Sequence, residues 1–370
     1  GKAAASLLGM NEQGSRLSTA FIWVGWAFIL FILQLLHLFL PLTAFVFIPV
    51  LVLGIAFAVP GIVSACRRWS SSPSRNNGAV ILIISVIFLA IAVWTASRAM
   101  LSPTNYDTGL YHLNKMRWIN SYPVIPGLGN LHGRLAFNQS FFAYAAALNF
   151  YPTFGHGRSI ANSFLLLLSL ATFIDLLRPV IRRPSLLLRA HPFEYISVIL
   201  AIPVLAYLAV TSNGLASPSP DLASALLQLL MFVVLVQGLG QWQYGEPDQD
   251  RRAVFLVLMA VSAVTIKLSN LAFAAVILGF VFLYFSSGRK RAGRLGGHLL
   301  IVSAVILVVW VVHSYVLSGT PFYPSTLGRL PLEWSVPAER VDNEAKWIYS
   351  WARQPGTDRN IVLSSWAWFE

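Results

Sequence analysis

The run VILIISVIFLAIAVWTAS, Val80–Ser97, decides the fold because it carries no charged residue over 18 positions. A helix rises about 1.5 Å per residue, so such a run crosses most of the roughly 30 Å hydrocarbon layer of a membrane. In the whole chain, 56% of residues are hydrophobic and only 11% are charged, and the mean hydropathy is +0.67. Soluble domains carry about a quarter charged residues. The sequence therefore predicts an integral membrane protein.

Together with this run, eight further apolar segments predict an all-α, polytopic transmembrane bundle with about nine membrane segments. Spanning segments must be helices because lipid offers no hydrogen-bond partner to the backbone. No internal repeat is visible in the sequence. The predicted segments are Ser18–Leu40, Leu42–Ala65, Val80–Ser97, Ile160–Leu177, Tyr195–Thr211, Leu222–Leu239, Val254–Ile266, Leu271–Phe285 and Leu299–Leu317.

Basic residues in the short connections predict the orientation of the bundle. The formal net charge is +12. Positive side chains favour the cytoplasmic side of a membrane, so we expect the long segments Arg98–Ser159 and Ser318–Glu370 to lie together on the extracytoplasmic side. The charge then reflects topology, and we expect no nucleic-acid partner. The basic positions used are Arg67, Arg68 and Arg75 in the linker CRRWSSSPSRNNG, then Arg178, Arg182, Arg183, Arg189, Arg251, Arg252, Arg289, Lys290, Arg291 and Arg294.

The organisation of the chain follows from these segments. We divide it into an N-terminal helix pair with a basic linker (1–78), a transmembrane core (79–317) that includes the loop 98–158, and an extracytoplasmic C-terminal region (318–370). The chain begins at Gly1 and ends in the aromatic run WAWFE, so we expect a fragment of a longer protein. The single Cys66 cannot form an intramolecular disulfide, and we interpret it as a small apolar filler.

A polar and aromatic loop, NYDTGLYHLNKMRWINSYPVIPGLGNLHGRLAFNQS (105–140), follows the apolar run Val80–Ser97. Asp107 and His112 are the catalytic candidates, because a carboxylate or an imidazole can move a proton and a carboxylate can also hold a metal. The alternative for Asp107 is a helix N-cap, since Asp before Thr-Gly-Leu is favourable capping chemistry.

The same loop supplies candidate substrate-binding residues. If TGLYHLNKMRW is helical, Tyr111 and Lys115 share a face at four-residue spacing. The cations Lys115, Arg117 and Arg134 can hold a phosphate, and Asn138 lies nearby in a stretch fixed by glycine and proline. For Arg134 the alternative is a solvated arginine or one at the lipid headgroups. We expect FFAYAAALNFY (141–151) to form a short helix that lies in the membrane interface or re-enters the membrane.

Two further charged positions belong to the predicted site. Asp221, in SPSPDLA, is either an acid that suits the start of a helix or a second carboxylate that faces the same cavity as Asp107. In the second case the two carboxylates can bind a divalent cation or activate a hydroxyl. Lys267 interrupts the apolar stretch from Ala253 to Phe285 in TIKLSN, and we place it near the extracytoplasmic tip of a shallow hairpin. It either binds phosphate there or only snorkels to the interface.

Two histidines within predicted helices, His37 and His313, are interpreted as packed or hydrogen-bonded inside the bundle. The sequence contains no HExxH, paired CxxC, Walker A or GxSxG motif, so soluble-type metalloprotease, NTPase and serine-hydrolase functions have no support.

In combination, NYDTGLYHLNKMRW, PGLGNLHGRL, SPSPDLA, TIKLSN and VLSGTPFYPSTLG resemble the GT-C superfamily of polyprenyl-phosphate-dependent glycosyltransferases. They resemble more closely a family of uncharacterised bacterial multi-pass membrane proteins. The resemblance implies that Asp107 is a base or metal ligand and that Lys267 is the basic residue of a short hairpin. It also implies a substrate-binding turn after a later helix, which here comprises Gly319, Pro321, Phe322, Tyr323 and Pro324.

The function implied by this resemblance is transfer of a sugar from a polyprenyl-phosphate-linked donor to an acceptor at the extracytoplasmic face of the bacterial inner membrane. Membrane lipid and the donor would be the partners. Two alternatives stay open. One is a transporter or lipid flippase of cell-envelope glycolipids, which normally has the internal repeats that this chain lacks. The other is an enzyme like the O-antigen ligases or polymerases, which use a lipid pyrophosphate.

Overall fold

The computed structural model describes residues 19–56, 78–182, 192–211, 213–239, 247–286 and 290–369. Across these ranges the chain is a bundle of α-helices and contains no strand. The longer helices are α2 (Ala20–His37), Ala44–Ala56, α4 (Gly78–Ala99), α7 (Gly157–Arg182), α9 (Pro192–Thr211), α10 (Pro220–Leu239), α11 (Pro247–Ile266), α12 (Leu271–Ser286) and α13 (Lys290–Ser318). Each of the nine predicted segments coincides with one of these helices over its described residues. Cys66, Arg183, Arg189, Arg289 and most of the basic linker lie outside the described residues.

Six of these helices are long and apolar enough to cross a membrane, among the residues described. They are α2, α4, α7, α10, α12 with the turn before it, and the part of α13 from Leu295. The prediction of an integral membrane protein is supported, and the expected nine segments exceed the helices that meet this criterion. Ala44–Ala56 and Tyr195–Thr211 are shorter apolar helices, and α11 carries Asp248, Asp250, Arg251 and Arg252 near its start.

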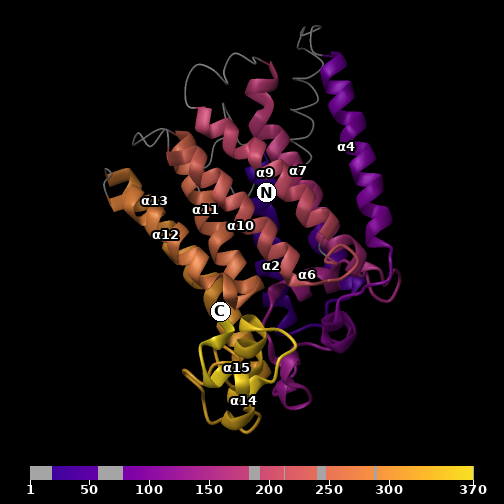
Figure 1. Cartoon of the computed structure of the whole chain (residues 1–370), viewed down its shortest axis with the longest axis vertical. Helices are drawn as coiled ribbons and strands as arrows, with labels where there is room; N and C mark the ends of the chain where they lie inside the picture. Colours follow the sequence, from indigo (N-terminus) through magenta and orange to yellow (C-terminus); the bar gives the residue numbers. More distant parts are fainter. Residues whose placement is uncertain are drawn as a thin grey trace.

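The centre of the bundle is α11. Every residue from Arg251 to Ile266 is buried, and the helix packs against α2, α6, α10, α12 and α13. A helix that is apolar on all sides is stable only when other helices surround it. α4 is the opposite case, because only 6% of its most apolar stretch is buried. It stands at the side of the bundle (Figure 1) and packs on α7, so most of its surface is available to lipid.

Successive helices alternate in direction, which brings the two long segments to the same end of the molecule, called here the loop end (Figure 1). At the far end, the indole nitrogen of Trp23 donates to the Thr172 hydroxyl at 2.9 Å and Tyr284 donates to Asp250 at 2.9 Å. At the loop end, Asn130 donates to the carbonyl of Trp334 at 2.8 Å. The predicted meeting of the two long segments is therefore present in the structure.

The first long segment contains η2 (Thr108–His112), α5 (Leu113–Ser121), η3 (Leu128–Asn130), η4 (Gly133–Ala136) and α6 (Ser140–Ala147). All eight residues of α6 are buried, and the helix packs between α2, α5 and α7. The expected helix in FFAYAAALNFY is thus present, and it is buried among other helices of the protein. Its small alanine side chains allow neighbouring helices to approach it closely.

Asparagine side chains fasten the irregular backbone at the loop end. The Asn162 amide on α7 donates to the carbonyls of Gly214, Ser217 and Ser219 at 2.9, 3.0 and 2.9 Å, which holds the connection between α9 and α10. The Asn120 amide donates to the carbonyls of Leu42 and Ala146 at 2.6 and 2.9 Å. Buried carbonyls without partners are costly, so these amides stabilise turns that helices cannot satisfy.

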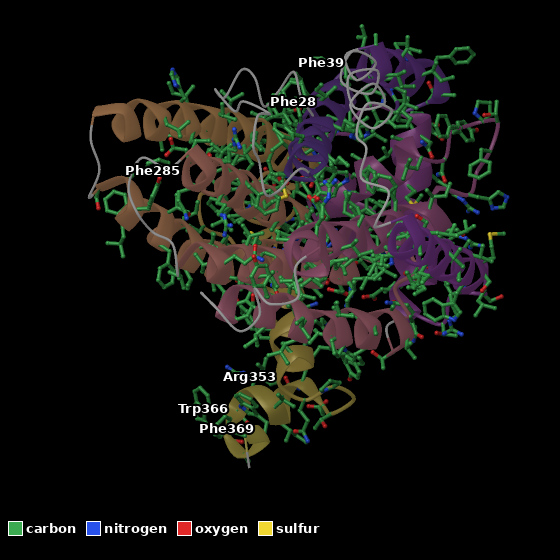
Figure 2. The ribbon with its side chains drawn as sticks, turned by 90° about the horizontal axis from the view of Figure 1, so that it is seen from above. Phe28, Phe39, Phe285, Arg353, Trp366 and Phe369 are labelled. Atoms are coloured by element: carbon green, nitrogen blue, oxygen red, sulfur yellow. The ribbon has the colours of Figure 1, made fainter. Side chains whose placement is uncertain are left out.

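The second long segment contains α14 (Ala338–Arg353), α15 (Arg359–Ser364) and η6 (Ala367–Phe369). It begins at Gly319, which ends α13 with φ of +76° and donates its N–H to the Tyr315 carbonyl at 2.8 Å. A Cβ at this position would lie 2.0 Å from the Ser335 hydroxyl oxygen, so glycine is required for the turn. Figure 2 shows Arg353, Trp366 and Phe369 together on this segment, apart from the bundle.

We predict that Asn162→Ala destabilises the protein, because three buried carbonyls lose their shared donor, at a cost of about 2–3 kcal/mol. The measurement is the apparent melting temperature of the detergent-solubilised protein. Ser163→Ala is the matched control, since the Ser163 hydroxyl donates only within its own helix, to the Ser159 carbonyl at 2.9 Å. Equal melting temperatures for the two variants would contradict a stabilising role for the hydrogen bonds that Asn162 donates.

Candidate functional site

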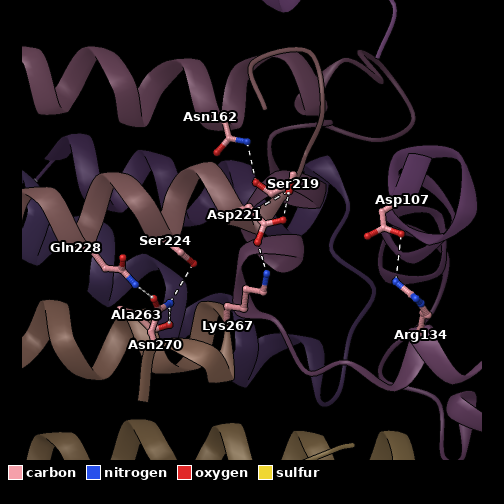
Figure 3. A network of polar contacts seen from close by, with 10 residues as sticks. All are labelled: Asp107, Arg134, Asn162, Ser219, Asp221, Ser224, Gln228, Ala263, Lys267 and Asn270. Atoms are coloured by element: carbon pink, nitrogen blue, oxygen red, sulfur yellow. Dashed lines mark hydrogen bonds and ion pairs between the residues drawn. The ribbon is translucent and has the colours of Figure 1, made fainter. Parts of the chain in front are cut away.

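Asp107 lies in the first turn of the helix that follows α4, and its carboxylate points to Arg134 (Figure 3). The Asp107 Oδ1 to Arg134 Nη1 distance is 3.2 Å. The Asp107 carboxylate forms no capping hydrogen bond. Instead, Asn105 Oδ1 accepts from the Asp107 backbone N–H at 2.9 Å. The alternative prediction of Asp107 as an N-cap is therefore wrong, because Asn105 fills that role and leaves the carboxylate available.

Arg134, in η4, is held between two carboxylates. Its Nε lies 3.3 Å from Oε1 of Glu344 on α14, opposite the contact with Asp107. The guanidinium carbon also lies 5.9 Å from the centroid of the Tyr111 ring. The side chains of Arg134, Asp107 and Glu344 are 28%, 33% and 16% exposed, so solvent reaches the cluster from the loop end.

The second ion pair joins Asp221, in the first turn of α10, to Lys267 (Figure 3). Lys267 lies between α11 and η5 (Leu268–Asn270), which leads into α12. The hairpin expected around this lysine is thus present, with Lys267 at its turn and at the loop end. Ser219 Oγ accepts from the Asp221 N–H at 3.3 Å, so Ser219 takes part in starting the helix while the Asp221 carboxylate pairs with Lys267.

The charges of both ion pairs influence the Asp107 carboxyl group. Partial burial raises the pKa of Asp107, and the negative charge of Asp221 acts in the same direction. The positive charges of Arg134 and Lys267 lower it without cancelling the increase. A raised pKa makes the carboxylate a stronger base, which suits a general base. Asp107 and Arg134 are thus in direct contact, as are Asp221 and Lys267, and the second pair acts on Asp107 only through its charges.

His112 lies beneath these ion pairs and is 1% exposed. Burial lowers its pKa to about 4, so the imidazole is neutral at pH 7. Its Nδ1 is 3.5 Å from the Ser217 hydroxyl, which in turn lies 2.5 Å from the Thr108 hydroxyl. The His112 ring packs on Tyr111 and Phe142, with centroids 4.4 and 5.3 Å away. His112 therefore packs with the aromatic side chains next to the ion pairs.

Two cations predicted to bind substrate lie elsewhere. Lys115 is 3% exposed, and its ammonium donates to the Leu135 carbonyl in η4. Burial lowers its pKa to about 7. Lys115 therefore holds the turn that carries Arg134 rather than facing a substrate. Arg117 is exposed on α5, two positions further along, and residues so spaced do not share a helix face.

Two other predicted residues are tied into the protein. The Asn138 amide donates to the Trp310 carbonyl at 2.5 Å, and the Trp310 indole donates back to the Asn138 carbonyl at 2.9 Å. Tyr323 is 5% exposed, and its hydroxyl has no hydrogen-bond partner among the described residues. A Cβ on Gly133 would lie 3.0 Å from both the Tyr323 hydroxyl and Glu344 Oε2, so Tyr323 borders the Arg134–Glu344 contact.

His37 and His313 are hydrogen-bonded inside the bundle, as the sequence interpretation expected, and the structure shows that they contact each other. His37 Nδ1 and His313 Nε2 are 2.8 Å apart, and His37 Nε2 lies 3.2 Å from the Tyr122 carbonyl. Within the described residues, no group of three or more His, Cys, Asp or Glu side chains is close enough to hold a metal ion.

Sequence reasoning did not identify Glu344, Ser217 or Thr108. Glu344 lies in an amphipathic helix, ERVDNEAKW, where nothing distinguishes it from its neighbour Glu339 before the fold is known. Ser217 was part of the polar SPSPDLA segment, whose position after an apolar helix was a usable signal.

The chain belongs to a family described as a domain of unknown function (DUF8201), whose model matches residues 1–370. None of the curated proteins and none of the solved structures compared with the chain matches it. Family membership therefore assigns no activity.

We predict that the stability of the protein rises with pH above about 7, and that Lys115→Met removes this part of the pH dependence. Burial lowers the Lys115 pKa to about 7 from its usual 10.5, so between these values the unfolded chain binds more protons than the folded one. Melting temperatures at pH 7 and pH 9 measure the effect. Lys346→Met, at an exposed position on α14, is the control and should keep the wild-type difference.

Proposed function

We propose that the protein is a membrane glycosyltransferase that moves a sugar from a polyprenyl-phosphate-linked donor to an acceptor hydroxyl or amine. One observation carries the proposal. Asp107, a partly exposed carboxylate with a raised pKa, contacts the cation Arg134, and a second cation, Lys267, is held by Asp221 at the same end of a helical bundle suited to a membrane. A base next to preplaced positive charge is the arrangement that such a transfer needs. The resemblance to GT-C enzymes supports the same chemistry.

In the proposed reaction, Asp107 accepts the proton of the acceptor hydroxyl as its oxygen attacks the anomeric carbon. The bond from that carbon to the phosphate oxygen breaks, and the electron pair leaves with the phosphate. The new glycosidic bond replaces it, and Asp107 later returns the proton to solvent. His112 is buried and neutral, so it packs beside the site and does not receive this proton.

The leaving phosphate gains negative charge, and Arg134 and Lys267 are the cations that would stabilise it. Both are partly exposed, at 28% and 34%. Arg134 uses Nε and Nη1 for its two carboxylates, and its Nη2 makes no hydrogen bond to a described residue. A guanidinium has five N–H donors in a planar fork, so a phosphate can bind without the arginine leaving Glu344.

The lipid tail of the donor would lie in the membrane against exposed apolar helices. α4 offers such a surface next to the loop that carries Asp107, with Leu82, Val86 and Leu89 exposed. Basic residues of the short connections, Arg251 and Lys290 among them, lie at the far end, where α11 and α13 begin. By the positive-inside rule this favours a loop end on the extracytoplasmic side of a bacterial inner membrane.

We predict that Asp107→Asn lowers the rate of glycosyl transfer by about 10²–10⁴-fold, because the variant lacks the proton acceptor. The assay measures transfer of radiolabelled sugar from synthetic polyprenyl-phosphate donors to hydroxyl acceptors by protein in nanodiscs. Asp342→Asn, exposed on α14, is the matched control and should retain activity. Transfer by Asp107→Asn at the wild-type rate, with normal membrane insertion, would remove the catalytic assignment.

We predict that Lys267→Ala mainly raises the apparent KM for the lipid donor, by about tenfold or more, as expected for loss of a charge-assisted contact. The KM for the acceptor should change little, because the lysine is placed on the phosphate side of the reaction. Steady-state kinetics with each substrate varied in turn make this measurement. A donor KM equal to that of the wild type would exclude a phosphate-binding role for Lys267.

A further inference from the structure

Glu344 lies 210 residues after Arg134 in the chain, yet its carboxylate contacts the Nε edge of that side chain at 3.3 Å. Asp107 contacts a different nitrogen, Nη1. Two carboxylates thus share one guanidinium from separate segments. Asp107 is the more exposed of the two, at 33% against 16%, so an incoming anion reaches the Asp107 side of the arginine first.

α14 fixes the position of Glu344. Val341, one turn earlier, is fully buried and packs in a small apolar cluster with Ala136, Tyr323 and Val336. Arg340 donates to the Asn130 carbonyl at 3.1 Å, which ties the same helix to η3. Gly133 leaves room for Glu344 Oε2 beside the Arg134 turn. The Glu344 carboxylate is therefore anchored to the loop by its surroundings as well as by the arginine.

We propose that Glu344 is a positioning residue that keeps Arg134 in place during donor binding. The phosphate of the donor then replaces Asp107 as a partner of Arg134. Donor binding then frees the base, so the donor binds before Asp107 can accept a proton. This inference rests on the proposed function for the identity of the phosphate. The geometry of the shared arginine is independent of it.

The exchange follows from charge and hydrogen bonding. An arginine beside a carboxyl group favours the ionised form, and an added anion favours the protonated form. A phosphate bound to Nη1 and Nη2 removes the first effect on Asp107 and adds the second. Asp107 thus becomes a stronger base when donor is present. Without Glu344, Arg134 would turn fully to Asp107 and hold it ionised and paired.

The test measures how readily Asp107 reacts with a carbodiimide, which modifies protonated carboxyl groups, by mass spectrometry of the peptide that contains it. The protein is the full chain in nanodiscs, titrated with pH. We expect Glu344→Gln to lower labelling at the wild-type midpoint by at least about threefold, since Arg134 then acts on Asp107 alone. Glu339→Gln, exposed on the same helix, should label as the wild type does.

A double-mutant cycle separates action through Arg134 from a direct effect of the Glu344 charge. In the Arg134→Gln background, Glu344→Gln should cause no further change in labelling. An equal change in both backgrounds, or no change in either, would overturn the positioning role. Glu344→Asp, which keeps the charge but shortens the side chain, provides a milder variant and should give an intermediate result.

Two phosphate probes test the exchange itself. Farnesyl phosphate in the nanodisc should raise Asp107 labelling at fixed pH, and inorganic phosphate at the same concentration should do so much less. An equal response to both probes would assign the site to free phosphate and contradict the lipid-linked donor, while leaving the role of Glu344 intact. No response to either probe would overturn the exchange. The readout requires no sugar transfer, so failure of the glycosyltransferase assay is distinguishable from failure of this proposal.

Discussion

The structure depends on one constraint, which is that irregular backbone in apolar surroundings must find hydrogen-bond partners within the protein. Helices satisfy this internally, but the loop end contains turns whose carbonyls are buried. Asparagine amides supply the missing donors, as Asn162 does for three carbonyls. Asn270 does the same between α10, α11 and α12, where it contacts the Ser224 hydroxyl and the Ala263 carbonyl at 3.0 and 2.8 Å. These amides make the loop end a fixed platform.

On this platform the charged side chains are shared rather than free. Arg134 forms ion pairs with both Asp107 and Glu344, and Lys267 forms one with Asp221. Exposed pairs of this kind contribute little to stability, so their value lies in placing charge where a ligand can reach it. The proposed anion site thus consists of partly exposed ion pairs on turns that neutral amides hold in place.

The helices were predictable because the length and composition of an apolar run determine whether it can cross a membrane. The hairpin at Lys267 was predictable for the same reason, since a charge inside an apolar stretch must lie near an end or a partner. Tertiary contacts decided the rest. The composition of the loop does not show that Asn105 rather than Asp107 caps the helix, or that Lys115 turns inward to the Leu135 carbonyl. Glu344 enters the site only because α14 folds back onto the first long segment.

The π-helical turn at Thr108–His112 has a consequence for how this family can vary. A π-turn accommodates one more residue than an α-helical turn of the same span, and each residue of an α-helix rotates the chain by about 100°. Loss of a single residue between Asp107 and α5 would restore a regular helix and swing the carboxylate to another face, away from the guanidinium. An insertion or deletion in this short stretch would therefore move Asp107 relative to Arg134.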